Sequence, residues 1–120
     1  MEYIVIASVN KTSYMVRLNA ESNAGAEHKI LDMSYCGLHE YGVEAAQAFD
    51  RKQMKSEHFI SMALRSHTVS QTELMEIIDQ RNRQIELRDL AERKVWELEA
   101  QMKKLTEDLE NARRILAENT

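Results

Sequence analysis

The 120-residue sequence has no proline and only three glycines, the last of which is Gly42. Inside a helix, proline and glycine cost about 3 and 1 kcal/mol relative to alanine, so they are the residues that most often end one. Residues 43–120 therefore have little reason to break a helix except at capping residues. We expect residues 70–120 to form one unbroken helix.

Cysteines and long apolar runs are also scarce. The single Cys36 cannot form an internal disulfide. The longest apolar run, Tyr3–Ala7, is far shorter than the roughly 20 residues that span a bilayer, and no basic segment precedes a longer one. The net charge is −4, whereas nucleic-acid-binding domains typically carry an excess of basic residues. These features predict a protein of the reducing cytoplasm, without membrane contact and with nucleic acid disfavoured as a partner.

The N-terminal residues have the pattern of a β-hairpin. Tyr3–Val9 is rich in β-branched residues and has no helical stripe, which indicates a strand buried on both faces. Asn10–Ser13 is a polar turn, and residues 14–18 alternate apolar and mixed side chains. The two strands pair most simply as an antiparallel hairpin.

A hairpin alone is marginally stable and needs cover. Residues 20–33, with Asn23 as a capping residue, predict a helix that supplies it. Residues 34–41 suggest a short third strand, although Gly37 in its middle is unfavourable. The alanine-rich segment Val43–Met54 favours a helix, and Ser56 can cap a further short helix.

The C-terminal helix has a clear N-terminal signal. In Ser70-Gln71-Thr72-Glu73 the serine hydroxyl can accept from the Glu73 amide while the glutamate reaches back to the Ser70 amide. The expected fold class is therefore α+β. We predict a small ββα(β) head with short helices over residues 1–69, followed by one long coiled-coil helix over residues 70–120.

Within this helix, apolar residues recur at alternating spacings of four and three, which is typical of a coiled-coil seam. The seam positions are Ala91, Val95, Leu98, Met102, Leu105, Leu109, Ala112 and Leu116. Upstream of the seam, the same register would bring arginines into it. We therefore expect the seam register to shift near Leu87. We expect the first third of the helix to pack on the head. Because a seam needs a partner helix, we predict a homo-oligomer, a dimer or higher.

The residues flanking the seam permit parallel pairing. The rim pairs of a parallel dimer would be Lys94 with Glu99, Gln101 with Thr106, and Asp108 with Arg113. Two of these pairs have opposite charge and none repels. Because exposed ion pairs contribute only about 0–1 kcal/mol each, an antiparallel arrangement stays open.

Outside the seam, Trp96 lies beside a band of basic residues. An indole outside the seam is usually either packed on a neighbouring domain or a dominant contact in an interface. The basic residues alternate with Glu86, Asp89 and Glu92, which favours a solvated face with ion pairs over a phosphate site. We predict a partner-binding surface made of Trp96, Arg81, Arg83, Arg88, Arg93 and Lys94.

Cys36, His39 and Glu40 place a thiol, an imidazole and a carboxylate close together. A metal site needs three or four ligands, and the other histidines show no ligand spacing. In a strand, Cys36 and His39 would point to opposite faces, which argues against a catalytic pair. We therefore predict structural roles, no catalytic residue, no metal and no cofactor, and that Cys36→Ser leaves activity intact.

The segment from Ala26-Glu27-His28-Lys29 to Ala45–Asp50, followed by a Glu/Arg-rich coiled coil, resembles small accessory proteins of the early regions of tailed bacteriophages that infect enteric bacteria. The resemblance lies in style, size and segment order and transfers no functional residue. Such proteins commonly bind a host protein of defence or nucleic-acid processing. It implies a viral, non-enzymatic inhibitor in the host cytoplasm. Two alternatives stay open: an oligomer that sequesters a nucleotide signal, and a nucleic-acid-associated accessory protein.

Overall fold

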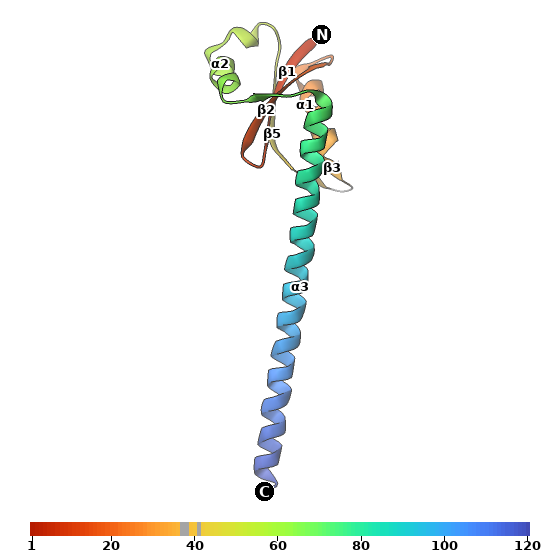
Figure 1. Ribbon diagram of the computed structural model, residues 1–120, viewed down its shortest axis with the longest axis vertical. Helices are drawn as coiled ribbons and strands as arrows, with labels where there is room; N and C mark the ends of the chain where they lie inside the picture. Colours follow the sequence, from red (N-terminus) through yellow and green to blue (C-terminus); the bar gives the residue numbers. More distant parts are fainter. Residues whose placement is uncertain (37–38, 41) are drawn as a thin grey trace. The chain divides into compact units, whose positions relative to one another are not determined.

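The computed structural model describes residues 1–36, 39–40 and 42–120, and the side chains outside 34–41. The fold is α+β, a small four-stranded sheet with short helices followed by a long C-terminal helix, as the sequence predicts (Figure 1). Its elements, in chain order, are β1 (Glu2–Val9), β2 (Thr12–Asn19), α1 (Asn23–Ser34), β3 (Tyr35–Cys36), β4 (His39–Glu40), β5 (Val43–Phe49), the 3-10 helix η1 (Gln53–Lys55), α2 (Glu57–Leu64), β6 (His67–Thr68) and α3 (Gln71–Glu118).

The predicted hairpin is confirmed: β1 and β2 pair antiparallel, with Val5 opposite Val16. Asn10 and Lys11 form the two-residue turn, both at positive φ (52° and 65°), as the mirror-image turns that match strand twist require. The carboxylate of Glu44 accepts a hydrogen bond from the Lys11 amide at 3.1 Å. This contact stabilises a conformation that a lysine rarely adopts.

The predicted helix over Val43–Met54 is wrong, because its first seven residues form the edge strand β5. This strand pairs antiparallel with β1, and the sheet order is β5-β1-β2-β6. On its outer side, the Ala48 amide donates to Glu27 Oε1 at 3.1 Å, and the Ala48 carbonyl accepts from Asn23 Nδ2 at 3.0 Å. Side chains of α1 therefore satisfy the strand edge, and pairing on both sides outweighs the helix propensity of alanine.

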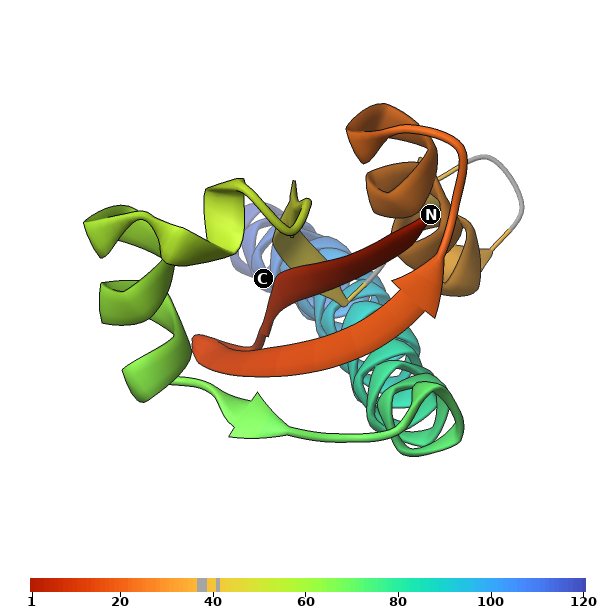
Figure 2. The same cartoon turned by 90° about the horizontal axis from the view of Figure 1, so that it is seen from above.

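The sheet is covered on both faces, as expected for a strand such as β1, whose residues 3–7 are all apolar. Figure 2 shows α1 and α2 on opposite sides of the β1–β2 hairpin. One face packs on α1 and the first turns of α3; its buried residues are Tyr3, Val5, Ala7, Val9, Val16, Leu18, Ala20, Ala26, Ile30, Ala48, Leu74 and Ile78. The other face packs on α2 through Ile6, Phe49 and Phe59. Alternate residues of β1 thus enter two separate clusters.

The expected third strand over residues 34–41 is not a strand of this sheet. Its described parts, β3 and β4, pair with each other as a separate two-stranded ladder, while residues 37–38 and 41 lie outside the described chain. The fourth strand is β6, which pairs parallel with β2. The Val69 amide donates to the Met15 carbonyl at 3.0 Å beside this pairing.

Both serine caps form as predicted. Ser56 Oγ accepts from the Phe59 amide at the start of α2, and Ser70 Oγ accepts from the Glu73 amide at 3.1 Å before α3. Although α3 starts where the sequence indicates, the compact units divide later, into Met1–Ile85 and Glu86–Thr120. The difference arises because the first turns of α3 pack on the sheet. We call these the first and second units.

Gly42 marks a close backbone approach within the first unit. Its φ is +77°, and a β-carbon there would lie 2.8 Å from Asn82 Oδ1. Gly42→Ala should lower the free energy of unfolding by about 1–3 kcal/mol through backbone strain and this clash. Gly25→Ala is the matched control, because Gly25 lies in α1 and the new methyl would lie 3.2 Å from the Ser22 hydroxyl and 4.0 Å from Ala20 Cβ, without a positive φ. Chemical denaturation should show loss at Gly42 and none, or a small gain, at Gly25; equal losses would contradict the assignment.

Candidate interaction surfaces

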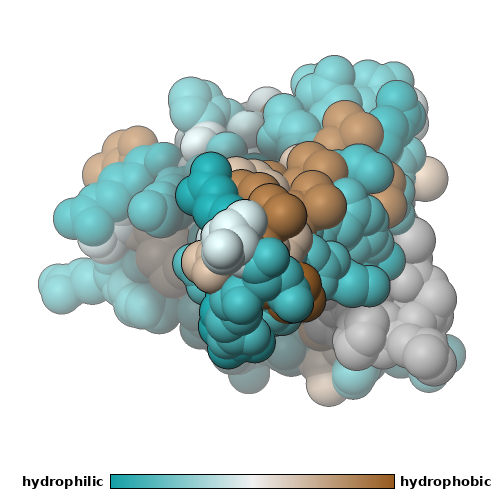
Figure 3. Space-filling view, turned by 90° about the horizontal axis from the view of Figure 1, so that it is seen from below, coloured by the Kyte–Doolittle hydropathy of each residue, from teal (hydrophilic) through white to brown (hydrophobic). Residues whose placement is uncertain are grey.

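The eight predicted seam residues all lie on α3 in the second unit, and all of them are exposed in the single chain. Val95 and Leu98 are 50% and 46% exposed, and Met102, Leu105 and Leu116 are each about two-thirds exposed. Figure 3 shows hydrophobic side chains (brown) at the surface among hydrophilic ones (teal), in a view from the side where α3 ends. The structure thus places the seam on one continuous helix and leaves its large apolar side chains without cover from the chain itself.

The polar residues beside the seam form the ion pairs that their mixed charge suggests. Arg88 Nε lies 4.0 Å from carboxylate oxygens of both Asp89 and Glu92, the latter one helical turn away. These groups are more than a third exposed, so the pairs contribute little to stability. The two carboxylates reduce the net charge around Arg88, the residue that the seam register would reach upstream.

The predicted partner-binding residues fall in both units of the chain. Arg81 and Arg83 belong to the first unit, whereas Arg88, Arg93, Lys94 and Trp96 belong to the second. The Trp96 side chain is 69% exposed. Its role as a contact in an interface stays a prediction.

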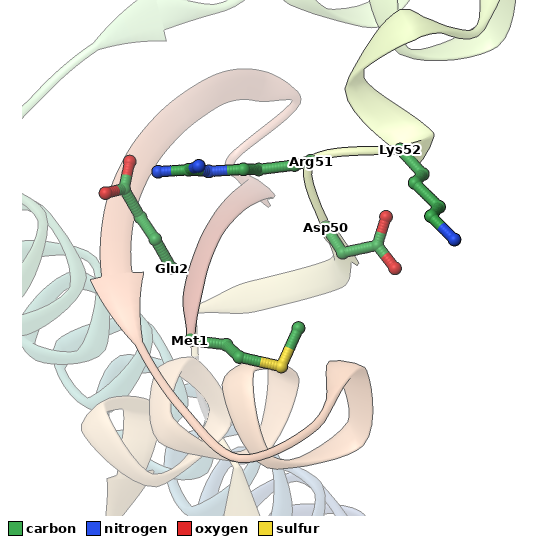
Figure 4. Close-up of a pocket in the computed structure, with 5 residues that line it drawn as sticks. All are labelled: Met1, Glu2, Asp50, Arg51 and Lys52. Atoms are coloured by element: carbon green, nitrogen blue, oxygen red, sulfur yellow. The ribbon is translucent and has the colours of Figure 1, made fainter.

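A cavity of about 490 Å³ in the first unit opens between the start of β1 and the turn after β5. Figure 4 shows Arg51 extending toward Glu2, while Asp50 and Lys52 point the other way. Glu2 already pairs with Arg17 at 3.1 Å, and Asp50 Oδ1 accepts from the Gln53 amide at 2.8 Å. Because two acidic and two basic side chains line this cavity and both carboxylates have other partners, its polar groups do not favour a ligand of one charge.

A smaller cleft of about 150 Å³ lies between the β1–β2 turn and the first turns of α3. Its lining residues are Val9, Asn10, Thr12, Tyr14, Ile77, Gln80, Arg81 and Gln84. We call it the Tyr14–Arg81 cleft. Sequence reasoning placed Arg81 on a basic band of the helix and did not bring it together with Tyr14. Their separation of 67 residues carries no local signal, and only the packing of α3 on the sheet joins them.

Catalytic and metal sites were not expected from the sequence. Within the described residues, no group of three or more His, Cys, Asp or Glu side chains could hold a metal ion. The side chains of Cys36, His39 and Glu40 lie outside the described part, so their structural role stays a prediction. None of the described helices is both long and apolar enough to cross a bilayer.

No protein-family model, curated protein or solved structure gives a significant match to this chain. The resemblance to phage accessory proteins therefore stays a prediction. A functional proposal for this protein rests on its own surfaces.

Proposed function

We propose that this protein is a non-enzymatic protein-binding module that self-associates through the seam of α3. The observation that carries the proposal is the exposure of the seam along the second unit. Burying a valine or leucine side chain contributes roughly 1.5–3 kcal/mol, and each heptad of the seam offers two such positions. A helix partner that covers these residues would therefore be strongly favoured, and a second copy supplies a seam of the same pattern.

We further propose that the assembled protein acts as a phage-encoded stoichiometric inhibitor or modulator of a host defence or nucleic-acid-processing protein in the bacterial cytoplasm. Trp96 supports a heterologous contact, because it lies on α3 outside the seam and is exposed. Tryptophan and arginine are the residues that most often dominate binding energy in interfaces. Arg93 and Lys94, on the same part of the helix, would contribute charge to such a contact.

The test is retention of a host protein by the immobilised chain. Trp96→Ala should reduce the retained protein by at least about tenfold, because truncation of such a residue costs about 2 kcal/mol or more. The oligomer mass and thermal midpoint should stay unchanged, since the side chain contacts little in its own chain. Leu90→Ala, which removes another large exposed side chain from α3, is the control and should retain the partner.

Other outcomes would decide against this function. Retention of DNA or RNA that falls steeply with salt would favour a nucleic-acid-associated protein. Stabilisation of the chain by a nucleotide, without any retained macromolecule, would favour a sequesterer. Loss of the oligomer together with the partner in Trp96→Ala would show that Trp96 supports the assembly rather than the contact.

A further inference from the structure

We propose that the Tyr14–Arg81 cleft binds the phosphate group of a small molecule. All eight lining residues lie in the first unit, so the site is complete within one chain. The proposal is independent of self-association and of the host partner, and failure of either would leave it standing.

The first argument is the nature of the polar groups. Six of the eight lining side chains carry hydrogen-bond donors, and none is a carboxylate; they are Asn10, Thr12, Tyr14, Gln80, Arg81 and Gln84. The chain as a whole has more acidic than basic residues, 20 against 16, so a cleft without a carboxylate differs from the average surface. A cleft of this composition favours an anion.

The second argument is the state of Arg81. In the described part of the chain, no carboxylate forms an ion pair with its guanidinium. Arg81 Nη1 donates a long hydrogen bond to Gln84 Oε1 at 3.4 Å. A guanidinium has five N–H donors in a fixed fork that suits phosphate oxygens. Arg81 therefore has the capacity to bind an anion without breaking an ion pair to any described side chain.

The third argument is the position of the cleft on a rigid support. Val9 is buried in the core, and Ile77 packs against the same cluster, so the apolar floor is fixed by the sheet and α3. Tyr14 lies in β2, and its backbone is fixed by the pairing of this strand with β1. Its ring centroid lies 6.0 Å from that of His67. The backbone that carries the lining residues is thus fixed before a ligand arrives, which lowers the entropic cost of binding.

The volume of the cleft and its number of hydrogen-bond donors favour a phosphate group over a larger ligand or a carboxylate. The volume of about 150 Å³ is below the roughly 300–1,000 Å³ of pockets that enclose a whole drug-sized ligand. We therefore expect the cleft to hold a phosphate group while the rest of the molecule stays outside. A carboxylate offers only two acceptor oxygens, whereas a phosphate monoester offers three on its terminal face and matches the larger set of donors.

The experiment is calorimetric titration of the full chain with inorganic phosphate, phenyl phosphate and acetate at constant ionic strength. Saturable binding of one phosphate per chain is expected, tighter than acetate. Arg81→Gln should weaken it by at least about tenfold, since a hydrogen bond to a charged group is worth about that factor or more. Arg65→Gln, which removes an equal charge from an exposed position of the same unit, should change the affinity less than about twofold.

Three results would overturn the proposal: no saturation with either phosphate, acetate binding as tight as phosphate, or equal weakening by the Arg81 and Arg65 substitutions. If Arg81→Gln does not fold, the phosphate affinities of Tyr14→Phe and Thr12→Val test the proposal instead. Each removes one hydroxyl from the lining, so each should weaken phosphate binding, and unchanged affinity in both would overturn the site. Amide resonances of Asn10 and Gln80 should shift with phosphate in the wild-type chain, and their constancy would also contradict it.

Discussion

Replacement of both Leu98 and Leu105 by aspartate is expected to convert a self-associated protein into a monomer of 14.0 kDa in light scattering. Both residues belong to the seam, where a partner helix would exclude water. An unpaired carboxylate in such a site loses its hydration without compensation, at a cost of several kcal/mol for each charge. We expect the cost of burying two such charges per chain to exceed the free energy gained by burying the remaining apolar residues of the seam.

A matched variant separates this effect from charge and helix propensity. Ala100→Asp with Asn111→Asp adds two aspartates to the same helix outside the seam, and it should keep the mass of the wild-type assembly. A wild-type mass near 14.0 kDa at tens of micromolar would contradict self-association directly. Dissociation by both double variants would show that added charge alone, not burial of the seam, decides the assembly.

Ile78→Ala is expected to lower the free energy of unfolding of the first unit by about 2–5 kcal/mol, the range for an isoleucine truncated in a close-packed core. Ile78 is fully buried in the cluster that joins α3, α1 and the sheet. A loss of this size is a large part of the roughly 5–15 kcal/mol that stabilises a typical domain. Denaturant unfolding followed by circular dichroism, at one protein concentration, measures it.

Leu87→Ala is the control for Ile78→Ala, because Leu87 lies on the same helix beyond the first unit and is 67% exposed. Its truncation should change the free energy of unfolding by less than about 0.5 kcal/mol. Similar losses from the two substitutions would show that the start of α3 does not pack on the sheet as a core element. A loss at Ile78 alone supports the division of the chain at Ile85.

Local sequence determined several elements that the structure contains. Absence of glycine and proline, together with the Ser70 cap, is sufficient for α3, because helix formation depends on contacts between near neighbours. The same holds for α2 behind Ser56 and for the β1–β2 hairpin, whose turn residues and alternation act over a few positions. The seam could also be predicted from the sequence, because the spacing of its apolar residues depends on one helix alone.

Only the tertiary structure decided the remainder of the sheet. The alanines of β5 favour a helix in isolation, but β1 on one side and the Asn23 and Glu27 side chains on the other satisfy the backbone as a strand. The Tyr14–Arg81 cleft likewise exists because Leu74 and Ile78 bury α3 against the sheet, which brings its next turn to the hairpin. Such features depend on contacts between residues far apart in the chain, whose free energy appears only when the core has formed.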